Sequence, residues 1–204
     1  MKVAIIPKTL HFEQPAGTSR GVYTTRKVWY ILLSDTENPK HIGVGGCAPL
    51  PALSCDDVPE YFDVLTKTSR RLEENAEAFL KNASMFLESL HAYPSIRCSV
   101  ETALAHYQAR SLQFWHTPFS KGKEGIPIIV VIWMGNFDEM YQRIEEKMKA
   151  GFRCIKLKIG AIDFEKDLEL LAHIRRHFSP EQIELRADAN GAFSPDDALE
   201  KLKR

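Results

Sequence analysis

The hydrophobic and polar positions of the chain alternate regularly in its second half. Apolar runs typical of strands buried on both faces cover residues 126–134, 152–159 and 183–189. Between them, residues 137–150 and 164–178 repeat apolar positions at helical spacing. The pair Ser194-Pro195 supplies an N-cap and a first-turn proline for a third helix. Strand–helix repeats of this length predict parallel strands joined by right-handed crossovers.

The first half begins with a β-rich pattern. Its short apolar stretches alternate loosely or are broken by glycine, and they cover residues 3–12, 24–34 and 41–47. Stretches of this kind, close together in the sequence, predict an antiparallel meander. Apolar positions at helical spacing follow over residues 56–90 and 99–112, with Pro94 interrupting the pattern between them. This half therefore has the pattern of an α+β domain.

A polar, glycine-containing segment over residues 120–125 separates the two halves. We expect an α+β domain over residues 1–120 and the start of a domain of β/α units over residues 121–204. A closed (β/α) barrel has eight such units, and a sheet of only three parallel strands would leave its apolar edges unpaired. The pattern therefore favours a TIM-type barrel that is incomplete in this chain over a small α/β sandwich that closes here.

The charge balance argues against nucleic acid as a partner. Lys plus Arg and Asp plus Glu each number 27, so the formal net charge is zero, and no basic block appears. The longest apolar run is far shorter than a membrane-spanning helix, so no membrane partner is expected. The four cysteines are scattered without a CxxC pair, and we expect no signal peptide. These features predict a cytoplasmic protein with reduced thiols.

Candidate chemistry lies at the ends of the second and third predicted strands. Lys156 and Lys158 are two residues apart, so their side chains project from the same face of a strand. Arg186, Asp188 and Asn190 share one face of the next strand for the same reason. The carboxyl ends of adjacent parallel strands are where (β/α) barrels do chemistry. The two motifs are therefore expected to meet at one edge of the sheet.

Each motif alone also has a plain structural explanation, because Asp-x-Asn often caps a turn and lysine pairs are common on exposed edge strands. Here, however, the lysines interrupt a strongly apolar run, and two like charges facing a barrel interior would be costly without a function. Each ammonium group disfavours the charged form of the other, which suits one of them to act as a general base. A carboxylate at a strand end suits a hard cation such as Mg²⁺. The combination favours a catalytic, metal-binding site.

These motifs resemble those of the enolase superfamily, in which Lys-x-Lys ends the second barrel strand and a metal-binding Asp ends the third. Residues 19–24 and 45–54 look like the two capping-domain loops of the o-succinylbenzoate synthase family within that superfamily. Residues 132–136 and 156–160 are also similar to the first and second barrel strands of that family. The resemblance runs across essentially the whole chain.

The resemblance implies an α+β capping domain followed by the first three β/α units of a TIM-type barrel. It also implies a dehydration that forms o-succinylbenzoate in menaquinone biosynthesis. Lys158 would remove the proton α to the substrate carboxylate as general base, and Lys156 would tune that base and neutralise the carboxylate. Asp188 would be the first of three Mg²⁺ ligands, and Asn190 would line the pocket or orient Asp188.

The resemblance further implies that the two capping loops contact the substrate. Arg20 lies in the first loop, and Pro51 and Leu53 lie in the second. These loops would cover the mouth of the barrel and contact the succinyl arm of a small-molecule carboxylate, although plain turn structure explains them equally well. Exposed strand edges would favour a homo-oligomer.

Two departures from the family pattern affect the expected activity. The family loop usually carries Glu at the position of Gly46. The metal carboxylates expected on the fourth and fifth barrel strands, and a later lysine on the opposite face, are absent from the 204 residues. Because one carboxylate holds Mg²⁺ only weakly, we expect the chain alone to be poorly active or inactive.

Two alternatives stay open at the level of sequence. A dipeptide epimerase or N-acylamino-acid racemase of the same superfamily would use the same base for a stereochemical inversion. A non-catalytic fragment would show no dependence of any property on Mg²⁺.

Overall fold

The computed structural model describes residues 1–18, 21–133, 135–160 and 162–204. The chain divides into two compact units. One comprises Met1–Phe12 with Thr25–Gly125, and the other comprises Glu13–Thr24 with Ile126–Arg204. Within the described ranges, no helix combines the length and the apolar character that crossing a bilayer requires.

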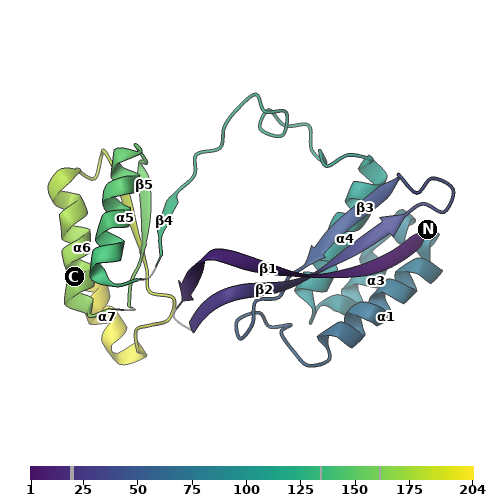
Figure 1. Cartoon of the computed structure of the whole chain (residues 1–204), viewed down its shortest axis with the longest axis horizontal. Coiled ribbons are helices and arrows are strands. Elements are labelled where there is room, and N and C mark those ends of the chain that lie inside the picture. Colours follow the sequence, from purple (N-terminus) through teal and green to yellow (C-terminus); the bar gives the residue numbers. More distant parts are fainter. Residues whose placement is uncertain (19–20, 134, 161) are drawn as a thin grey trace. The chain divides into compact units, whose positions relative to one another are not determined.

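Most of the first unit consists of a sheet and the helices that follow it (Figure 1). The strands are β1 (Lys2–Thr18), β2 (Gly21–Ser34) and β3 (Ile42–Cys47), in the order β1-β2-β3. Residues 13–18 of β1 and 21–24 of β2 are grouped with the other unit. β2 and β3 are antiparallel, with Trp29 opposite Cys47 and Ser34 opposite Ile42. The helices are α1 (Tyr61–Glu74), α2 (Ala76–Lys81), α3 (Ser84–Leu87), the 3₁₀ helix η1 (Glu88–Leu90) and α4 (Pro94–Ala109). The expected α+β pattern of this half is confirmed.

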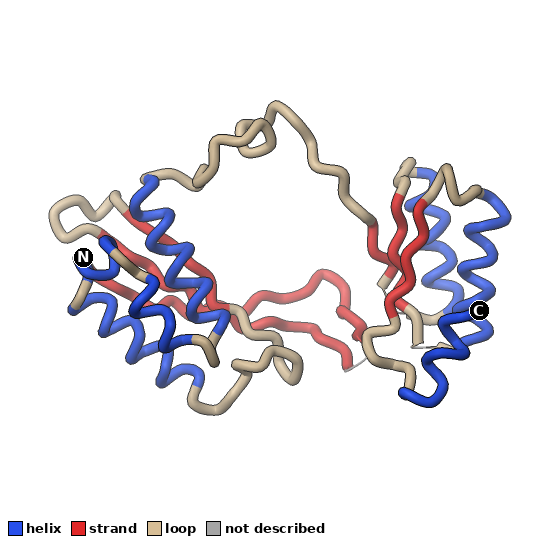
Figure 2. The backbone as a smooth tube through the Cα atoms, turned by 180° about the vertical axis from the view of Figure 1, so that it is seen from behind, coloured by secondary structure: helices blue, strands red, loops and turns tan. Residues whose placement is uncertain are grey.

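Glycines allow α4 to lie directly against β3 (Figure 2). Gly43 and Gly45 are buried under the helix, and a Cβ on Gly45 would stand 1.8 Å from the Ser99 carbonyl oxygen. Gly46 points to the exposed side, where a Cβ would be 3.7 Å from the nearest atom of the Tyr30 ring. The face of β3 that meets α4 therefore excludes a side chain at Gly43 and Gly45. The opposite face has room for a Cβ at Gly46.

The second unit contains a parallel sheet and three helices (Figure 1). Its strands are β4 (Val130–Ile132), β5 (Cys154–Lys158) and β6 (Glu184–Asp188), and both pairings in the order β4-β5-β6 are parallel. Its helices are α5 (Phe137–Lys149), α6 (Phe164–His177) and α7 (Pro195–Lys203). The alternation of strands and helices, and the parallel direction of the strands, agree with the sequence pattern.

The core of this unit lies between the sheet and the helices α5 and α6. Its fully buried large side chains are Ile132, Met140, Ile144, Ile155, Leu157, Leu170 and Ile174. The strand β5 contributes alternate residues, and the helices contribute residues three or four apart. Asn136, Asp163 and Ser194 cap the three helices, each accepting a hydrogen bond from a first-turn backbone N–H. These caps fix where each helix begins after its strand.

Two boundaries differ from the sequence-based expectation. Pro94 does not interrupt a helical segment but opens α4 as its first residue, where the missing N–H of proline costs no hydrogen bond. The strand β4 occupies only Val130–Ile132 of the predicted apolar run 126–134. The predicted end of that run, Met134, lies outside the described residues.

The helix α6 buries a more polar face than its apolar spacing predicts. The spacing predicts a stripe of Leu168, Leu171 and Ile174, but Leu168 and Leu171 are only partly buried. The structure instead buries Asp167 and His173 together with Ile174. Both polar side chains form hydrogen bonds with neighbouring elements, which offsets the cost of their burial. The buried face of α6 therefore combines these two polar residues with the apolar Leu170 and Ile174.

Gly45→Ala is expected to lower the free energy of unfolding of the first unit by about 1–3 kcal/mol, because the new Cβ overlaps the Ser99 carbonyl. Gly46→Ala on the same strand is the matched control, with an expected change within about 0.5 kcal/mol. Urea unfolding followed by circular dichroism measures both. Equal effects of the two substitutions would contradict the close contact between β3 and α4.

Candidate active site

The parallel register of β5 and β6 brings the predicted polar residues together. Lys156 lies opposite Arg186, and Lys158 lies opposite Asp188 at the last position of both strands. Between the lysines, Leu157 is fully buried in the core formed with α5 and α6. Because successive side chains of a strand point to opposite faces, the lysines project from the sheet face that these helices do not cover.

Both lysines converge on a single oxygen atom. Lys156 Nζ lies 2.8 Å and Lys158 Nζ lies 2.7 Å from Asp188 Oδ2. The side chains are partly buried, with exposed fractions of 30% for Lys156, 17% for Lys158 and 24% for Asp188. Partial burial strengthens the attraction of each ammonium group to the carboxylate. Asp188 therefore offsets the repulsion between the two like charges.

Asn190 holds Asp188 from the other side. Its backbone N–H donates to Asp188 Oδ1 at 2.9 Å, which forms an Asx turn directly after β6. Its side-chain Oδ1 accepts a hydrogen bond from Lys158 Nζ. The φ of Asn190 is +48°, a left-handed conformation that asparagine tolerates better than most residues. The turn thus orients Asp188 and contributes a second oxygen beside Lys158.

These donors hold the pKa of the Asp188 carboxyl well below its usual range. The hydrogen bond from Lys156 is the largest cause, the one from Lys158 follows, and the Asn190 N–H adds a smaller effect against the opposing effect of burial. Asp188 is consequently ionised throughout the neutral range. It is available both as the counterion of the lysines and as an oxygen donor to a cation.

Arg186 stays outside this cluster, although its position on β6 predicts the same face as Asp188. Its Nε donates to Glu184 Oε1 at 2.6 Å, and both side chains are more than half exposed. The guanidinium group is therefore bound within its own strand. The structure brings together Lys156, Lys158, Asp188 and Asn190 and leaves Arg186 apart.

The predicted loop residues lie in the turns that follow β3. Pro51 and Leu53 are both exposed, and Leu53 keeps 55% of its surface accessible. The turn is held locally, since the Ala52 N–H donates to Asp57 Oδ2 at 2.8 Å. The third predicted loop residue, Arg20, lies outside the described residues.

Two buried carboxylates bind the backbone or side chains of neighbouring segments, and neither was identified as buried from the sequence. The polar run Glu165-Lys166-Asp167 predicts a solvated helix face, which is wrong for Asp167. Asp56 is 1% exposed, and its Oδ2 accepts hydrogen bonds from the backbone and hydroxyl of Ser95 at the start of α4. Asp167 is 0% exposed and accepts from the Gly160 N–H at 2.8 Å, two residues after Lys158. The available signal was the place of Asp167 in the apolar stripe of α6, where a charged group requires a partner.

Asp188 is the group of this cluster that suits a hard cation. Its carboxylate and the Asn190 amide oxygen are the kinds of donor that Mg²⁺ prefers. Across the described ranges, no group of three or more His, Cys, Asp and Glu side chains is arranged to hold a metal ion. The donor chemistry therefore fits Mg²⁺ through one carboxylate ligand. The two ammonium groups at Oδ2 compete with a cation for that oxygen.

Comparison with known proteins identifies relatives of this chain. Residues 139–204 match the family model described as "Enolase C-terminal domain-like". The chain is 36% identical to the o-succinylbenzoate synthase of Desulfotalea psychrophila, over 100% of this chain and 61% of that protein. It is 23% identical to the D-Ala-D/L-Ala epimerase of Cytophaga hutchinsonii, over 98% of this chain and 54% of that protein.

Solved structures show the same relationship. The crystal structure of MenC from Desulfotalea psychrophila matches with a TM-score of 0.75 at 31% identity, covering 100% of this chain and 60% of that chain. The dipeptide epimerase from Enterococcus faecalis, complexed with Mg and the dipeptide L-Leu-L-Tyr, has a TM-score of 0.75 at 17% identity, which shows the fold alone. That match covers 99% of this chain and 56% of the epimerase. The chain spans about three-fifths of the length of these relatives.

Asp188→Asn is expected to lower the free energy of unfolding of the second unit by about 1–2 kcal/mol, because it leaves two partly buried ammonium groups without their counterion. Glu184→Gln, which breaks the exposed pair with Arg186 on the same strand, is the control and should cost less than about 1 kcal/mol. Hydrogen exchange of the β5 amides in increasing urea measures both. A larger loss in the control would show that the convergent pairing contributes little.

The contribution of Asp188 should also depend on pH. Its pKa is lowered in the folded state, so its stabilisation is fully present above the unfolded value of about 3.9 and is lost as the pH falls from there toward the folded pKa. The difference in stability between the wild type and Asp188→Asn is therefore expected to be constant near neutral pH and to shrink below about pH 4. Urea unfolding at a series of pH values tests this, and a difference that grows in acid would contradict it.

Proposed function

The chain belongs to the enolase superfamily, and from this premise we propose that it supplies the capping domain and first three β/α units of an o-succinylbenzoate synthase. In this proposal, residues 1–120 form the cap and residues 121–204 begin the barrel. The observation that carries it is the convergence of two lysine ammonium groups on Asp188 at the carboxyl ends of parallel strands. The relative that is 36% identical over the whole chain supports the choice of reaction.

Lys158 is the proposed general base that removes the proton α to the substrate carboxylate. Its side chain is less exposed than that of Lys156, and Asn190 is a second partner for its Nζ. Lys156 binds the same carboxylate oxygen, so it can keep Asp188 paired while Lys158 gives up a proton and accepts another. The carbon–oxygen bond of the neighbouring hydroxyl group then breaks. The electron pair of the broken carbon–hydrogen bond completes the aromatic ring, and the hydroxyl group leaves as water with the proton that Lys158 has taken up.

Asp188 is the proposed Mg²⁺ ligand of this chain. The ion, when bound, supplies a Lewis acid that stabilises negative charge on the substrate carboxylate. Asp188 is ionised at neutral pH, and the Asn190 N–H fixes the direction of its carboxylate. Because the described residues offer this cluster a single carboxylate, weak binding of the ion and low activity are expected of the chain by itself.

The proposed substrate is a small carboxylate, a hydroxycyclohexadiene carboxylate with a succinyl arm. Pro51 and Leu53 are the proposed contacts to that arm, together with Arg20 from the other capping loop. The exposure of Pro51 and Leu53 supports this, because their side chains are accessible to a ligand and the turn that carries them is internally hydrogen-bonded.

A dipeptide epimerase is the second candidate, favoured by the fold that the chain shares with the Enterococcus faecalis enzyme. The same lysine would then remove a proton α to the carboxylate of an amino-acid residue, and an acid on the opposite side would return one. The products separate the two proposals, since one reaction creates an aromatic ring and the other inverts a stereocentre.

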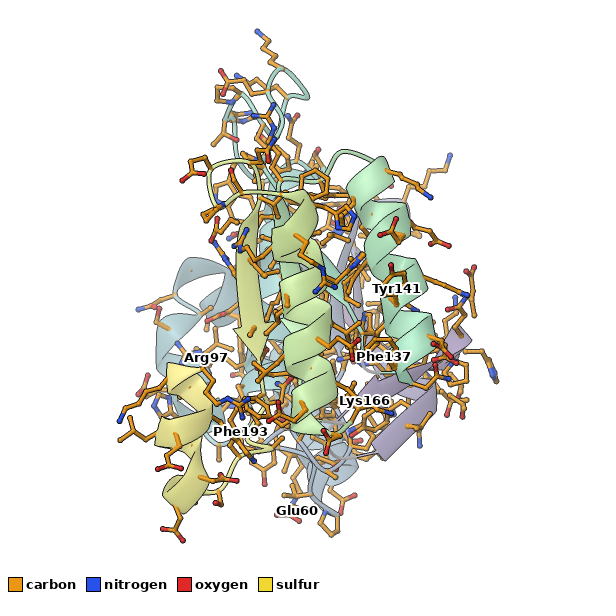
Figure 3. The ribbon with its side chains drawn as sticks, turned by 90° about the vertical axis from the view of Figure 1, so that its left-hand side faces the viewer. Glu60, Arg97, Phe137, Tyr141, Lys166 and Phe193 are labelled. Atoms are coloured by element: carbon orange, nitrogen blue, oxygen red, sulfur yellow. The ribbon has the colours of Figure 1, made fainter. Side chains whose placement is uncertain are left out.

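Turnover of the cyclohexadiene acid with Mg²⁺, followed by the absorbance of the aromatic product, tests the proposal. The chain alone should give little product, and any longer translation product of its gene should give more. In that longer protein, Lys158→Ala should lower kcat by at least about 10²-fold, because the base is lost. Lys166→Ala is the matched control, since Lys166 is an exposed lysine on α6 (Figure 3), and kcat should stay within about 2-fold.

The other outcomes identify the alternatives. Inversion of a dipeptide such as L-Ala-L-Glu, without turnover of the cyclohexadiene acid, would replace the synthase by an epimerase. A folded longer protein that turns over neither substrate and shows no dependence on Mg²⁺ would be non-catalytic, and both enzymatic proposals would be rejected.

A further inference from the structure

The carboxylate of Asp167 is buried and accepts one hydrogen bond, from the backbone of Gly160. Asp167 lies on the first turn of α6, its exposed fraction is 0%, and its Oδ2 accepts from the Gly160 N–H at 2.8 Å. Its Oδ1 is buried and has no hydrogen-bond partner among the described residues. Packing alone does not require a carboxylate here, because an apolar side chain would fill the position at lower cost. What the carboxylate adds is the bond to Gly160.

The backbone that leaves Lys158 is tied to a neighbouring element at two successive residues. The Ile159 N–H donates to the carbonyl oxygen of Asp188 at 3.0 Å, which joins the end of β5 to the end of β6. The next N–H, that of Gly160, donates to Asp167 and joins the same segment to α6. Lys158 is therefore followed by a segment fixed between a strand and a helix.

Gly160 also lies in close contact with the loop after β6. Its φ is +88°, a conformation that favours glycine, and a Cβ there would stand 2.4 Å from the Cβ of Ala192. The next residue is Phe193, which is labelled in Figure 3. Its ring packs edge-on against that of Phe164 of α6, with ring centroids 5.5 Å apart. That loop contains Asn190, which accepts a hydrogen bond from Lys158. Gly160 therefore packs against the loop that carries Asn190, one of the two hydrogen-bond partners of Lys158.

We propose that Asp167 is a positioning residue for Lys158. By holding the Gly160 N–H, its carboxylate fixes the end of β5 so that the Lys158 ammonium group meets Asp188 Oδ2 and Asn190 Oδ1 together. Asp167 touches neither the lysine nor a reacting atom, so it acts only through the backbone. The importance of this positioning for catalysis rests on the proposed function, in which Lys158 is the base.

Hydrogen exchange and lysine acylation test the proposal in the 204-residue chain. In Asp167→Ala, the Gly160 amide should exchange at least about 10-fold faster than in the wild type, while amides inside β5 change by less than about 2-fold. Acylation of Lys158 by an N-hydroxysuccinimide ester, measured by mass spectrometry relative to exposed Lys166, should rise by about 3-fold or more, because looser positioning frees the ammonium group.

Three further variants isolate the role of the hydrogen bond. Asp167→Leu fills the buried position with an apolar side chain that cannot accept a hydrogen bond. It should give the two results expected of Asp167→Ala, and it replaces that variant in the test if the alanine protein does not fold. Asp167→Asn keeps an acceptor of the same shape but without charge, so both readouts should fall between those of the wild type and of Asp167→Leu. Asp163→Ala is the matched control, because it removes the N-cap of the same helix but leaves the hydrogen bond between Asp167 and Gly160 in place. It should leave the acylation of Lys158 unchanged.

Acylation of Lys158 at the wild-type rate in a folded Asp167→Ala or Asp167→Leu protein would overturn the proposal. The proposal would also be overturned if the Gly160 amide of the wild type exchanged as fast as an unprotected amide. Faster exchange confined to the amides of α6 would reassign Asp167 to the stability of that helix. None of these readouts uses a substrate, so a failure of the synthase proposal is recognised separately, by the absence of turnover.

Discussion

The parallel pairing of β5 with β6 is the interaction on which the candidate site depends. Its register places Lys158 opposite Asp188 at the end of both strands. A shift of one residue would turn the lysines toward the helices and Leu157 toward the polar face. The core prevents that shift, because Ile155 and Leu157 are fully buried with the apolar faces of α5 and α6. The hydrophobic packing of the second unit therefore also fixes the geometry of its charged cluster.

Asp188 has two roles that compete. In the structure it is the shared counterion of Lys156 and Lys158, and the same carboxylate is the ligand proposed for Mg²⁺. A cation that binds there must replace part of the lysine pairing, which frees an ammonium group to interact with the substrate or to lose its proton. In the proposed function, Asp188 would therefore couple metal binding to the availability of a base. Asn190 keeps Asp188 oriented from the other side, so that rearrangement need not disturb the end of β6.

In the first unit, the main constraint is the close contact between the backbones of β3 and α4. In the second unit, it is the ion pairing between β5 and β6. Gly43 and Gly45 allow α4 to contact β3 without intervening side chains, whereas the opposite face of the same strand is open at Gly46. At Gly46, where the family usually has Glu, an added Cβ would lie 3.7 Å from the Tyr30 ring, which is an ordinary van der Waals contact. The turns that follow β3 are anchored by the buried Asp56, which binds Ser95 at the start of α4 and leaves Leu53 accessible.

The sequence by itself determined the order of the elements, the parallel direction of the second sheet and the grouping of Lys156, Lys158 and Asp188, because these follow from periodicity and from motif spacing. It also assigned the family, since the motifs that resemble the enolase superfamily are local in sequence. Only the tertiary structure decided which carboxylate oxygen the lysines share, that Arg186 binds Glu184 instead, and that Asp167 is buried against Gly160. Those outcomes depend on which side chains meet in the folded chain, in most cases between residues of different elements. The pattern along a single strand or helix does not contain that information.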